Sequence, residues 1–190
     1  MEEMQTIRPK LRLRMPSITE SSNQGLVKLA QKLAPADITF TFYDKIGSLP
    51  FYNEDLEDSS RTPASVLQWR ELVSNSDALF IASPEYNFGP SAVLKNAIDW
   101  ATRPMGQHAM SGKVISLISS SGGTGGSHMI EQLSTVVTIL GNTVINEPNG
   151  QIPKGAQRIS TEGSTSDPSI EELVTARLQA IIDAVNNLGK

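Results

Sequence analysis

Residues 78–101 read ALFIASPEYNFGPSAVLKNAIDWA. The first five residues are apolar without a break, which is typical of a strand buried on both faces of a parallel sheet. Residues 83–90 then contain turn-forming Ser, Pro, Asn and Gly, and the apolar residues of 91–101 recur at helical spacing. A buried strand, a turn and an amphipathic helix form a βα unit, so this stretch predicts an α/β fold.

The same alternation of strand and helix continues along the chain in both directions. Five βα units in 190 residues are the size of a flavodoxin-like fold. We therefore expect one domain, 1–190, with a doubly wound parallel sheet of five strands in the order 2-1-3-4-5 between two helical layers. Residues 149–169 are rich in Ser, Gly and Pro and are interpreted as a long loop. The other strands are predicted at 10–15, 38–43, 113–118 and 143–145, and the other helices at 25–33, 63–73, 129–140 and 170–188.

The first strand is unusual for the centre of such a sheet. Lys10, Arg12 and Arg14 alternate with apolar residues, which puts three cations on one face of a strand that should be covered on both. Burial of unpaired charges is costly. Three interpretations stay open: a shorter or shifted strand, long side chains that reach the edge of the sheet, or a departure from the standard fold.

The composition limits the chemistry that this chain can perform alone. It contains no Cys, 16 Lys and Arg, and 20 Asp and Glu, so the net charge is −4. The absence of Cys excludes disulfide frameworks, thiolate metal sites and cysteine nucleophiles, so a cofactor must carry any redox chemistry. His108 and His128 have no metal-ligand spacing around them, and no metal site is predicted.

Charge and hydropathy also limit the partners. A mildly acidic chain is not expected to bind nucleic acid, because phosphate affinity comes largely from clustered Lys and Arg. No run of about 18 apolar residues is present, so no contact with a membrane is expected. Residues 1–14 mix acids and bases without an apolar core and are not interpreted as a signal peptide. We expect a cytoplasmic protein.

Candidate ligand-binding residues follow the predicted strands, because open α/β sheets bind ligands beyond the carboxyl ends of their strands. After the strand at 78–82, Tyr86 and Phe88 offer ring faces and Asn87 offers an amide. After the strand at 113–118, the glycines of SSSGGTGG would let the backbone approach a flat ring closely. An ordinary βα loop with a surface tyrosine remains an alternative for the first segment.

The residues SPEYN at 83–87 are followed by VLKNAIDW at 93–100. This combination closely resembles the signature of the NADPH-dependent FMN reductase family, which includes bacterial quinone, chromate and azo-compound reductases. LPFYNEDL at 49–56 and SSSGGTGG at 119–126 resemble the family's loops after the second and fourth strands. The resemblance covers roughly residues 21–146 and implies a flavodoxin-like fold that binds FMN non-covalently.

The resemblance also implies which residues surround the flavin ring. The loop after the strand at 78–82 should line the isoalloxazine, and the glycine-rich loop should approach it from the neighbouring strand. The set implied in this way is Pro84, Glu85, Tyr86, Asn87, Ser120 and Gly122.

The segment expected to bind the FMN phosphate departs from the family pattern. That pattern begins Gly-Ser-x-Arg and ends Ser-x-Asn; its end survives as Ser21-Ser22-Asn23, whereas its start aligns with Met15-Pro16-Ser17-Ile18. Pro16 lacks a backbone donor and Ile18 lacks a cation. Hydroxyls at the start of a helix can still hold a phosphate, and a simple N-cap cluster is the alternative. The phosphate-binding candidates are Ser17, Thr19, Ser21, Ser22 and Asn23.

The reaction implied by the resemblance is carried by the flavin. NADPH or NADH would reduce FMN by hydride transfer, and FMN would then reduce a small-molecule electron acceptor such as a quinone, azo compound or metal oxyanion in a ping-pong cycle. No side chain needs to act as an acid or base, so no catalytic residue is named. The family implies a homodimer or homotetramer, with the helix at 93–100 and the loop at 49–56 as interface candidates.

Two other functions stay open at this point. One is a flavodoxin-like electron carrier without NAD(P)H turnover. The other is an FMN-deficient binding or regulatory module, which the altered segment at 15–18 favours.

Overall fold

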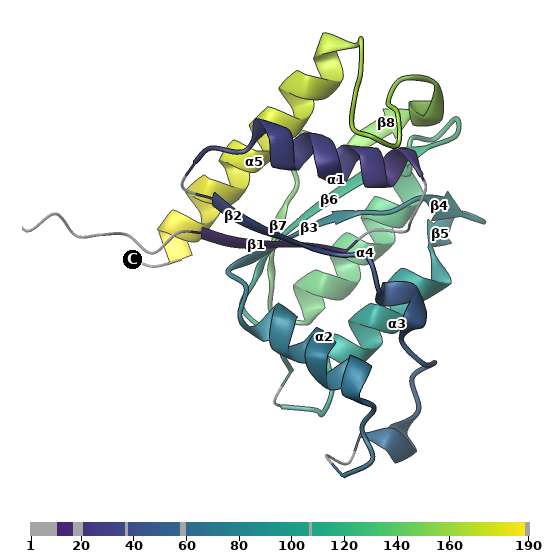
Figure 1. Cartoon of the computed structure of the whole chain (residues 1–190), viewed down its shortest axis with the longest axis vertical. Coiled ribbons are helices and arrows are strands. Elements are labelled where there is room, and N and C mark those ends of the chain that lie inside the picture. The colour runs from purple at the N-terminus through teal and green to yellow at the C-terminus, as the bar shows by residue number, and fades with distance from the viewer. Residues whose placement is uncertain (1–10, 17–20, 37, 58–59, 107, 189–190) are drawn as a thin grey trace, which may run out of the picture.

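The computed structural model describes residues 11–16, 21–36, 38–57, 60–106 and 108–188. Its centre is a twisted parallel sheet with five strands hydrogen-bonded in the order β2-β1-β3-β6-β7 (Figure 1). A sixth short strand, β8 (Gln151–Pro153), runs parallel to the carboxyl end of β6. The strands of the main path are β1 (Leu11–Pro16), β2 (Ile38–Tyr43), β3 (Ala78–Ala82), β6 (Val114–Ser121) and β7 (Thr143–Ile145).

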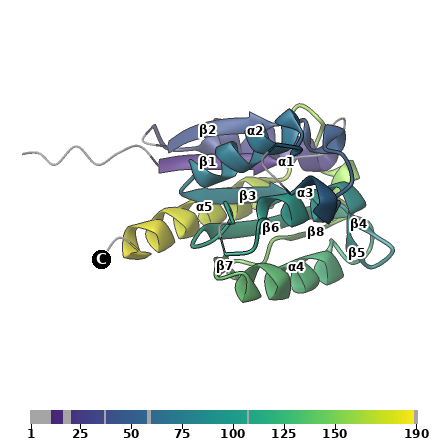
Figure 2. The same ribbon diagram turned by 90° about the horizontal axis from the view of Figure 1, so that it is seen from below.

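Helices cover both faces of this sheet. One face carries α1 (Ser22–Leu33) and α5 (Pro168–Leu188), and the other carries α2 (Ala64–Ser74), α3 (Ala92–Ala101) and α4 (Ser127–Ile139), as Figures 1 and 2 show. The result is a three-layered α/β fold with a parallel sheet, as the sequence predicts. None of the helices in the described part of the chain is long and apolar enough to cross a membrane.

The β3 strand shows why its sequence is apolar without a break. Ala78, Phe80 and Ala82 pack into the core beneath α1 and α5, whereas Leu79 and Ile81 pack into the core beneath α2, α3 and α4. Successive side chains of a strand point to opposite faces, so a strand covered on both sides needs an apolar residue at every position.

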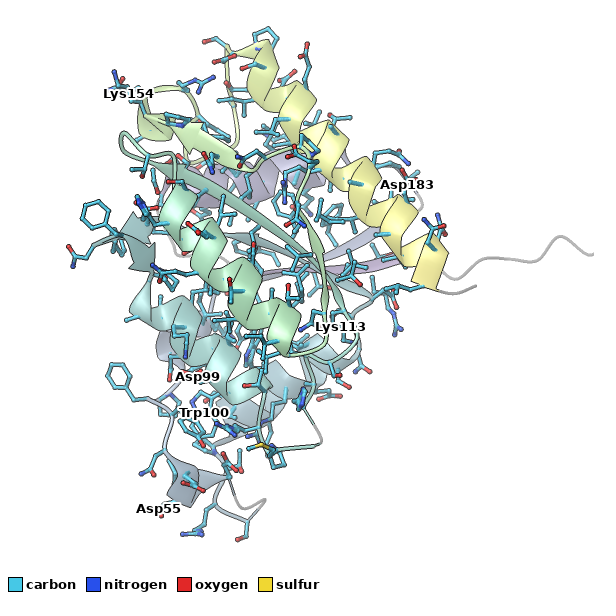
Figure 3. All side chains as sticks on the ribbon, turned by 180° about the vertical axis from the view of Figure 1, so that it is seen from behind. Asp55, Asp99, Trp100, Lys113, Lys154 and Asp183 are labelled. Carbon is cyan, nitrogen blue, oxygen red and sulfur yellow. The ribbon has the colours of Figure 1, made fainter. Side chains whose placement is uncertain are left out.

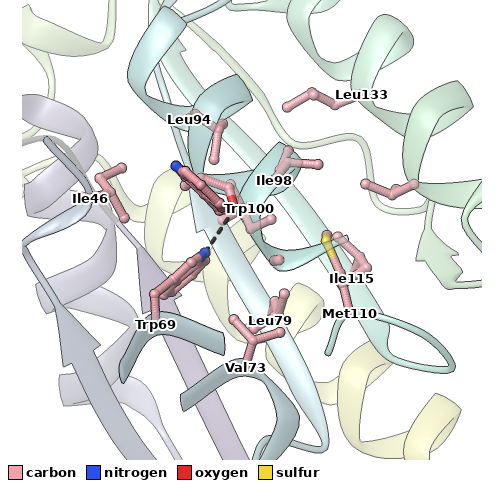
Figure 4. Close-up of a cluster of buried hydrophobic side chains, with 14 of the residues drawn as sticks. Ile46, Trp69, Val73, Leu79, Leu94, Ile98, Trp100, Met110, Ile115 and Leu133 are labelled. Atoms are coloured by element: carbon pink, nitrogen blue, oxygen red, sulfur yellow. Dashed lines mark hydrogen bonds between the residues drawn. The ribbon is translucent and has the colours of Figure 1, made fainter. Parts of the chain in front are cut away.

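The core beneath α2 and α3 also holds both tryptophans (Figure 4). The Trp69 indole donates to the Ala97 carbonyl at 2.8 Å, and the Trp100 indole donates to the Pro50 carbonyl at 2.7 Å. Asn96 accepts from the Tyr52 backbone N–H at 2.8 Å. Thus α3 fixes the start of the loop at 49–56, and the two tryptophans are packing residues.

Of the β1 cations, Arg12 is the one whose side chain the structure describes, and it lies at the start of the strand. Only Leu13 and Arg14 of β1 pair in register with β3. Arg12 precedes this pairing, and its guanidinium lies 3.4 Å from the Asp77 carboxylate with 55% of the side chain exposed. For Arg12, the long side chain therefore reaches the edge of the sheet, while Lys10 lies outside the described residues.

The interpretation of residues 149–169 as one long loop is wrong. This segment contains β8, a 3₁₀ turn at Gly155–Gln157 and the first residues of α5. Gly150 allows the chain before β8 to lie close to β6. Any side chain at this position would collide with β6, because a Cβ would lie only 2.2 Å from the Leu117 carbonyl oxygen. With one apolar residue, Ile152, the three-residue β8 has no strand periodicity of its own, so it forms through contact with β6. The sheet therefore has six strands rather than five.

Candidate functional site

A cavity of about 760 Å³ opens at the carboxyl ends of the parallel strands, beside the start of α1. Ligand sites in proteins usually measure about 300–1,000 Å³, and doubly wound sheets place them at this edge. The cavity lies between the start of α1, the loop after β3, the end of β6 and the segment after β8. Its lining residues are Ser21, Ser22, Asn23, Pro84, Glu85, Tyr86, Ser120, Ser121, Gly122, Lys154, Ala156, Gln157, Ile159, Ser160 and Thr161.

The start of α1 is fastened to the end of β6 by three hydrogen bonds. The buried Asn23 amide donates to the Ser120 carbonyl at 2.9 Å and accepts from the Ser120 N–H at 2.8 Å. The Ser120 hydroxyl donates to that of Ser22 at 2.5 Å. Both polar atoms of the Asn23 side chain are occupied by the Ser120 backbone, so Asn23 positions α1 against β6. The hydroxyls of Ser22 and Ser120 remain at the cavity.

Ser21 is the N-cap of α1. Its hydroxyl accepts from the Gln24 N–H at 3.3 Å, and the first turn of α1 contains no acidic residue. The N-cap interpretation therefore applies to Ser21, and the positive end of the helix dipole faces the cavity without a carboxylate on it. Ser17 and Thr19 lie outside the described residues.

Glu85 lines the cavity, but its carboxylate is held by the start of α4. It accepts from the Thr124 hydroxyl and the His128 N–H, each at 2.9 Å, and from the Met129 N–H at 3.2 Å. Gly126, the N-cap residue of α4, has no side chain to cap the helix, so Glu85 does so from another loop. Burial raises the pKa of Glu85, but these hydrogen bonds outweigh burial and hold that pKa below its usual value.

The loop after β3 folds into a small antiparallel ribbon, β4 (Glu85–Tyr86) and β5 (Gly89–Pro90). Its turn consists of Asn87 and Phe88, both at positive φ. Asn87 is not among the cavity-lining residues, whereas Tyr86 lines the cavity and is 59% exposed. Phe88 packs edge-on against His128 with ring centroids 5.2 Å apart. The motif therefore brings Pro84, Glu85 and Tyr86 to the cavity and directs Asn87 away.

The glycine-rich loop after β6 has two parts. A Cβ at Gly122 or Gly123 would meet no atom within 4 Å. At Gly126, with φ +91, a Cβ would lie 2.1 Å from the Ser119 hydroxyl oxygen. Gly122, which lines the cavity, thus leaves open space there, whereas Gly126 is required by its own backbone and by packing.

The segment after β8 contributes to the cavity, and the sequence analysis did not identify it. It packs so closely against β6 that a Cβ at Gly155 would lie 2.0 Å from the Ser120 hydroxyl oxygen. It also touches α1, because a Cβ at Gly25 would lie 2.0 Å from the Ser160 carbonyl oxygen. The only local sign of this role is Gly155 next to Lys154, which is too weak to identify without the fold.

Most of this chain matches the model of a known protein family. The model of the family described as NADPH-dependent FMN reductase matches residues 15–157. The chain belongs to this family. A relative, the 2-hydroxy-1,4-benzoquinone reductase of Burkholderia sp., is 36% identical over 146 residues, which are 76% of this chain and 78% of the relative.

Solved structures agree with this assignment. The flavoenzyme NAD(P)H:(acceptor) oxidoreductase FerB of Paracoccus denitrificans superposes with a TM-score of 0.83 at 32% identity, over 94% of this chain and 98% of that chain. A WrbA-like flavodoxin of Agrobacterium tumefaciens gives a TM-score of 0.60 at 14% identity, over 95% of this chain and 99% of that chain. The second similarity concerns the fold alone and identifies it as flavodoxin-like.

Proposed function

We propose that this FMN reductase family member is an FMN-dependent NAD(P)H oxidoreductase that reduces quinones and similar small-molecule acceptors. The observation that carries the proposal is the cavity itself. Serine hydroxyls, the start of a helix and glycine-opened backbone converge on one space of about 760 Å³ at the switch point of the sheet. The names of the relatives, a benzoquinone reductase and an NAD(P)H:(acceptor) oxidoreductase, supply the reaction class.

The residues at the cavity fit FMN. Its phosphate suits the Ser21 and Ser22 hydroxyls at the acid-free start of α1. The family resemblance adds Ser17 and Thr19, which lie outside the described residues. Its flat ring suits the backbone at Gly122, where no side chain intervenes, and the exposed ring of Tyr86. When bound, FMN accepts hydride from NAD(P)H and passes electrons to an acceptor.

The remaining predicted residues act by holding the site in shape. Asn23 fixes Ser120 and thereby sets the distance between α1 and β6. Pro84 stiffens the exit from β3. Glu85 fixes the start of α4 and so the glycine loop that precedes it. Asn87, on the ribbon turn, is not among the residues that line the cavity, and its contact with the flavin stays a prediction from the family resemblance.

Both substrates would use the same cavity in turn. It lies at one edge of the sheet, and Tyr86 borders it with an aromatic face that can stack on a nicotinamide or a quinone. Sequential use of one space gives ping-pong kinetics. An electron carrier or an FMN-deficient module is not favoured, because the matched relatives are named as reductases.

We further infer a homodimer or homotetramer and a standard flavodoxin strand order. Phe51, in the loop that α3 fixes, is 82% exposed, and Met105 beyond α3 is 78% exposed; aromatic residues and Met are enriched at subunit interfaces. The path β2-β1-β3-β6-β7 corresponds to 2-1-3-4-5 when β8 and the ribbon are treated as additions.

Steady-state kinetics test the proposal. With FMN present, NADPH or NADH is varied at several fixed concentrations of a benzoquinone. Parallel lines in the double-reciprocal plot are expected, and intersecting lines would contradict the shared cavity. A flavin-loaded protein that oxidises neither nucleotide would instead support the electron carrier.

A further inference from the structure

Lys154 is the only cation among the described residues that line the cavity. It follows β8, is exposed, and makes no ion pair with any described residue. Figure 3 shows it at the end of the sheet opposite Lys113, which precedes β6. A free ammonium at the mouth of a ligand cavity is suited to an anionic ligand.

The neighbouring cations are already engaged. Arg158 pairs with Asp167 at 2.5 Å. Lys28 pairs with Glu162 at 2.9 Å. Each of these two charges is partly neutralised by its carboxylate partner. Lys154 has no such partner among the described residues, so its charge is available to a ligand.

The backbone of Lys154 is held in an uncommon conformation. Its φ of 52° and ψ of 33° lie in the left-handed region, which a residue other than glycine, asparagine or aspartate seldom adopts. Its N–H donates to the Gly122 carbonyl at 2.9 Å, and the following Gly155 packs on Ser120. Such strain persists where the surroundings fix it, and it gathers at ligand sites.

Contacts connect Lys154 to the start of α1. Gly155 touches Ser120, and the Ser120 hydroxyl donates to that of Ser22 at 2.5 Å. The four-carbon stem of a lysine can reach across these neighbours. Lys154 and the helix start line the same cavity, so this exposed ammonium is within reach of an anion bound there, where the aligned Ile18 supplies no charge.

We propose that Lys154, in the segment after β8, supplies the positive charge that binds the phosphate of FMN in this cavity, beside the hydroxyls at the start of α1. The proposal rests on the proposed function, since it requires FMN to bind here. NADPH also carries phosphate groups and is the other candidate ligand for this lysine. In both ligands a phosphate oxygen would accept a charge-assisted hydrogen bond from the ammonium.

The test is an equilibrium titration of flavin-free protein with FMN and, separately, with riboflavin. Binding is measured by the quenching of flavin fluorescence. Lys154→Gln should weaken FMN binding about tenfold, as for loss of one charge-assisted hydrogen bond, and leave riboflavin binding unchanged. Lys154→Arg should restore most of the FMN affinity. Lys113→Gln makes the same charge change at the other end of the sheet and should not alter either affinity.

Lys154→Gly separates binding from folding. It removes the ammonium and relieves the left-handed backbone, so FMN affinity should fall as in Lys154→Gln while the melting temperature stays the same or rises. Equal weakening of FMN and riboflavin in these variants would overturn the assignment, because it would place the effect at the ring or in the fold.

The remaining outcomes are also decisive. If wild-type protein binds FMN and Lys154→Gln binds it equally well, the assignment to FMN is overturned and the proposed function stands. In that case a KM raised for NADPH but not for NADH would assign the lysine contact to the 2′-phosphate of NADPH, the one group that the two nucleotides do not share. If wild-type protein binds no flavin, the proposed function fails, and this assignment fails with it.

Discussion

The two walls of the cavity differ in what their polar groups do. On the wall near α4, Glu85, Thr124 and the first amides of the helix satisfy one another. On the wall near α1, Ser22 and Lys154 line the cavity, and Lys154 makes no ion pair with any described residue. The family motif lies on the first wall, and the charge suited to a ligand lies on the second. Within this motif, Glu85 therefore holds the frame of the site, whereas Tyr86 is the residue that faces a ligand.

The glycine loop offers the largest test of this difference. Gly126→Ala would force a side chain into a left-handed backbone and against Ser119, so we expect a stability loss of about 2–4 kcal/mol. Gly122→Ala, in the same loop, meets no atom within 4 Å and should change stability little while weakening FMN binding. Urea denaturation and flavin titration of both variants make the measurement. Equal stability of the two variants would contradict the assignment of Gly126 to the fold and of Gly122 to the ligand.

Glu85 tests the wall near α4. Glu85→Ala leaves the start of α4 without its distant cap and should lower the free energy of unfolding by about 1–3 kcal/mol. Glu85→Gln keeps one carbonyl acceptor and should lose less. If urea denaturation shows no loss in Glu85→Ala while FMN affinity falls, the carboxylate serves the ligand and the comparison of the walls is wrong.

The same carboxylate predicts a dependence of stability on pH. The pKa of Glu85 is lower in the folded protein than its ordinary value of 4.5, so its contribution is complete above that value. It is lost as the pH falls through the lower, folded-state pKa. Unfolding midpoints measured between neutral and acidic pH should therefore fall more steeply for wild-type protein than for Glu85→Gln. Parallel curves would show that the carboxylate is not engaged.

The smallest expected effect concerns the wall near α1. Lys154→Gly relieves a left-handed backbone, worth about 1–2 kcal/mol, but gives the unfolded chain more freedom at a cost of about 0.5–1 kcal/mol, so stability should rise by about 0.5–1 kcal/mol. A gain in stability accompanied by a loss of FMN affinity would show that this residue is kept for binding. A loss of stability, read from thermal unfolding, would mean that the lysine side chain packs in the folded protein.

The sequence predicts most of the frame because its signals are local. The apolar run at 78–82 matches β3, and the helical spacing over 91–101 places α3 within one residue of its bounds. The motif at Pro84–Tyr86 likewise identifies the family and one wall of the cavity.

The remaining features depend on contacts between distant residues. Pairing with β6, rather than its own pattern, makes β8 a strand. Glu85 caps a helix that begins more than 40 residues later in the chain. The left-handed Lys154 is set by Gly122 and Ser120 on another strand. No local periodicity encodes these relations, so they become visible only in the fold.

One measurement tests the central claim most directly: the absorbance spectrum of the FMN-loaded protein, recorded without oxygen during addition of NADPH and then of a benzoquinone. We predict that the bands of oxidised flavin disappear with NADPH and return with the quinone. Flavin that stays with the protein but remains oxidised in both NADPH and NADH would contradict the account.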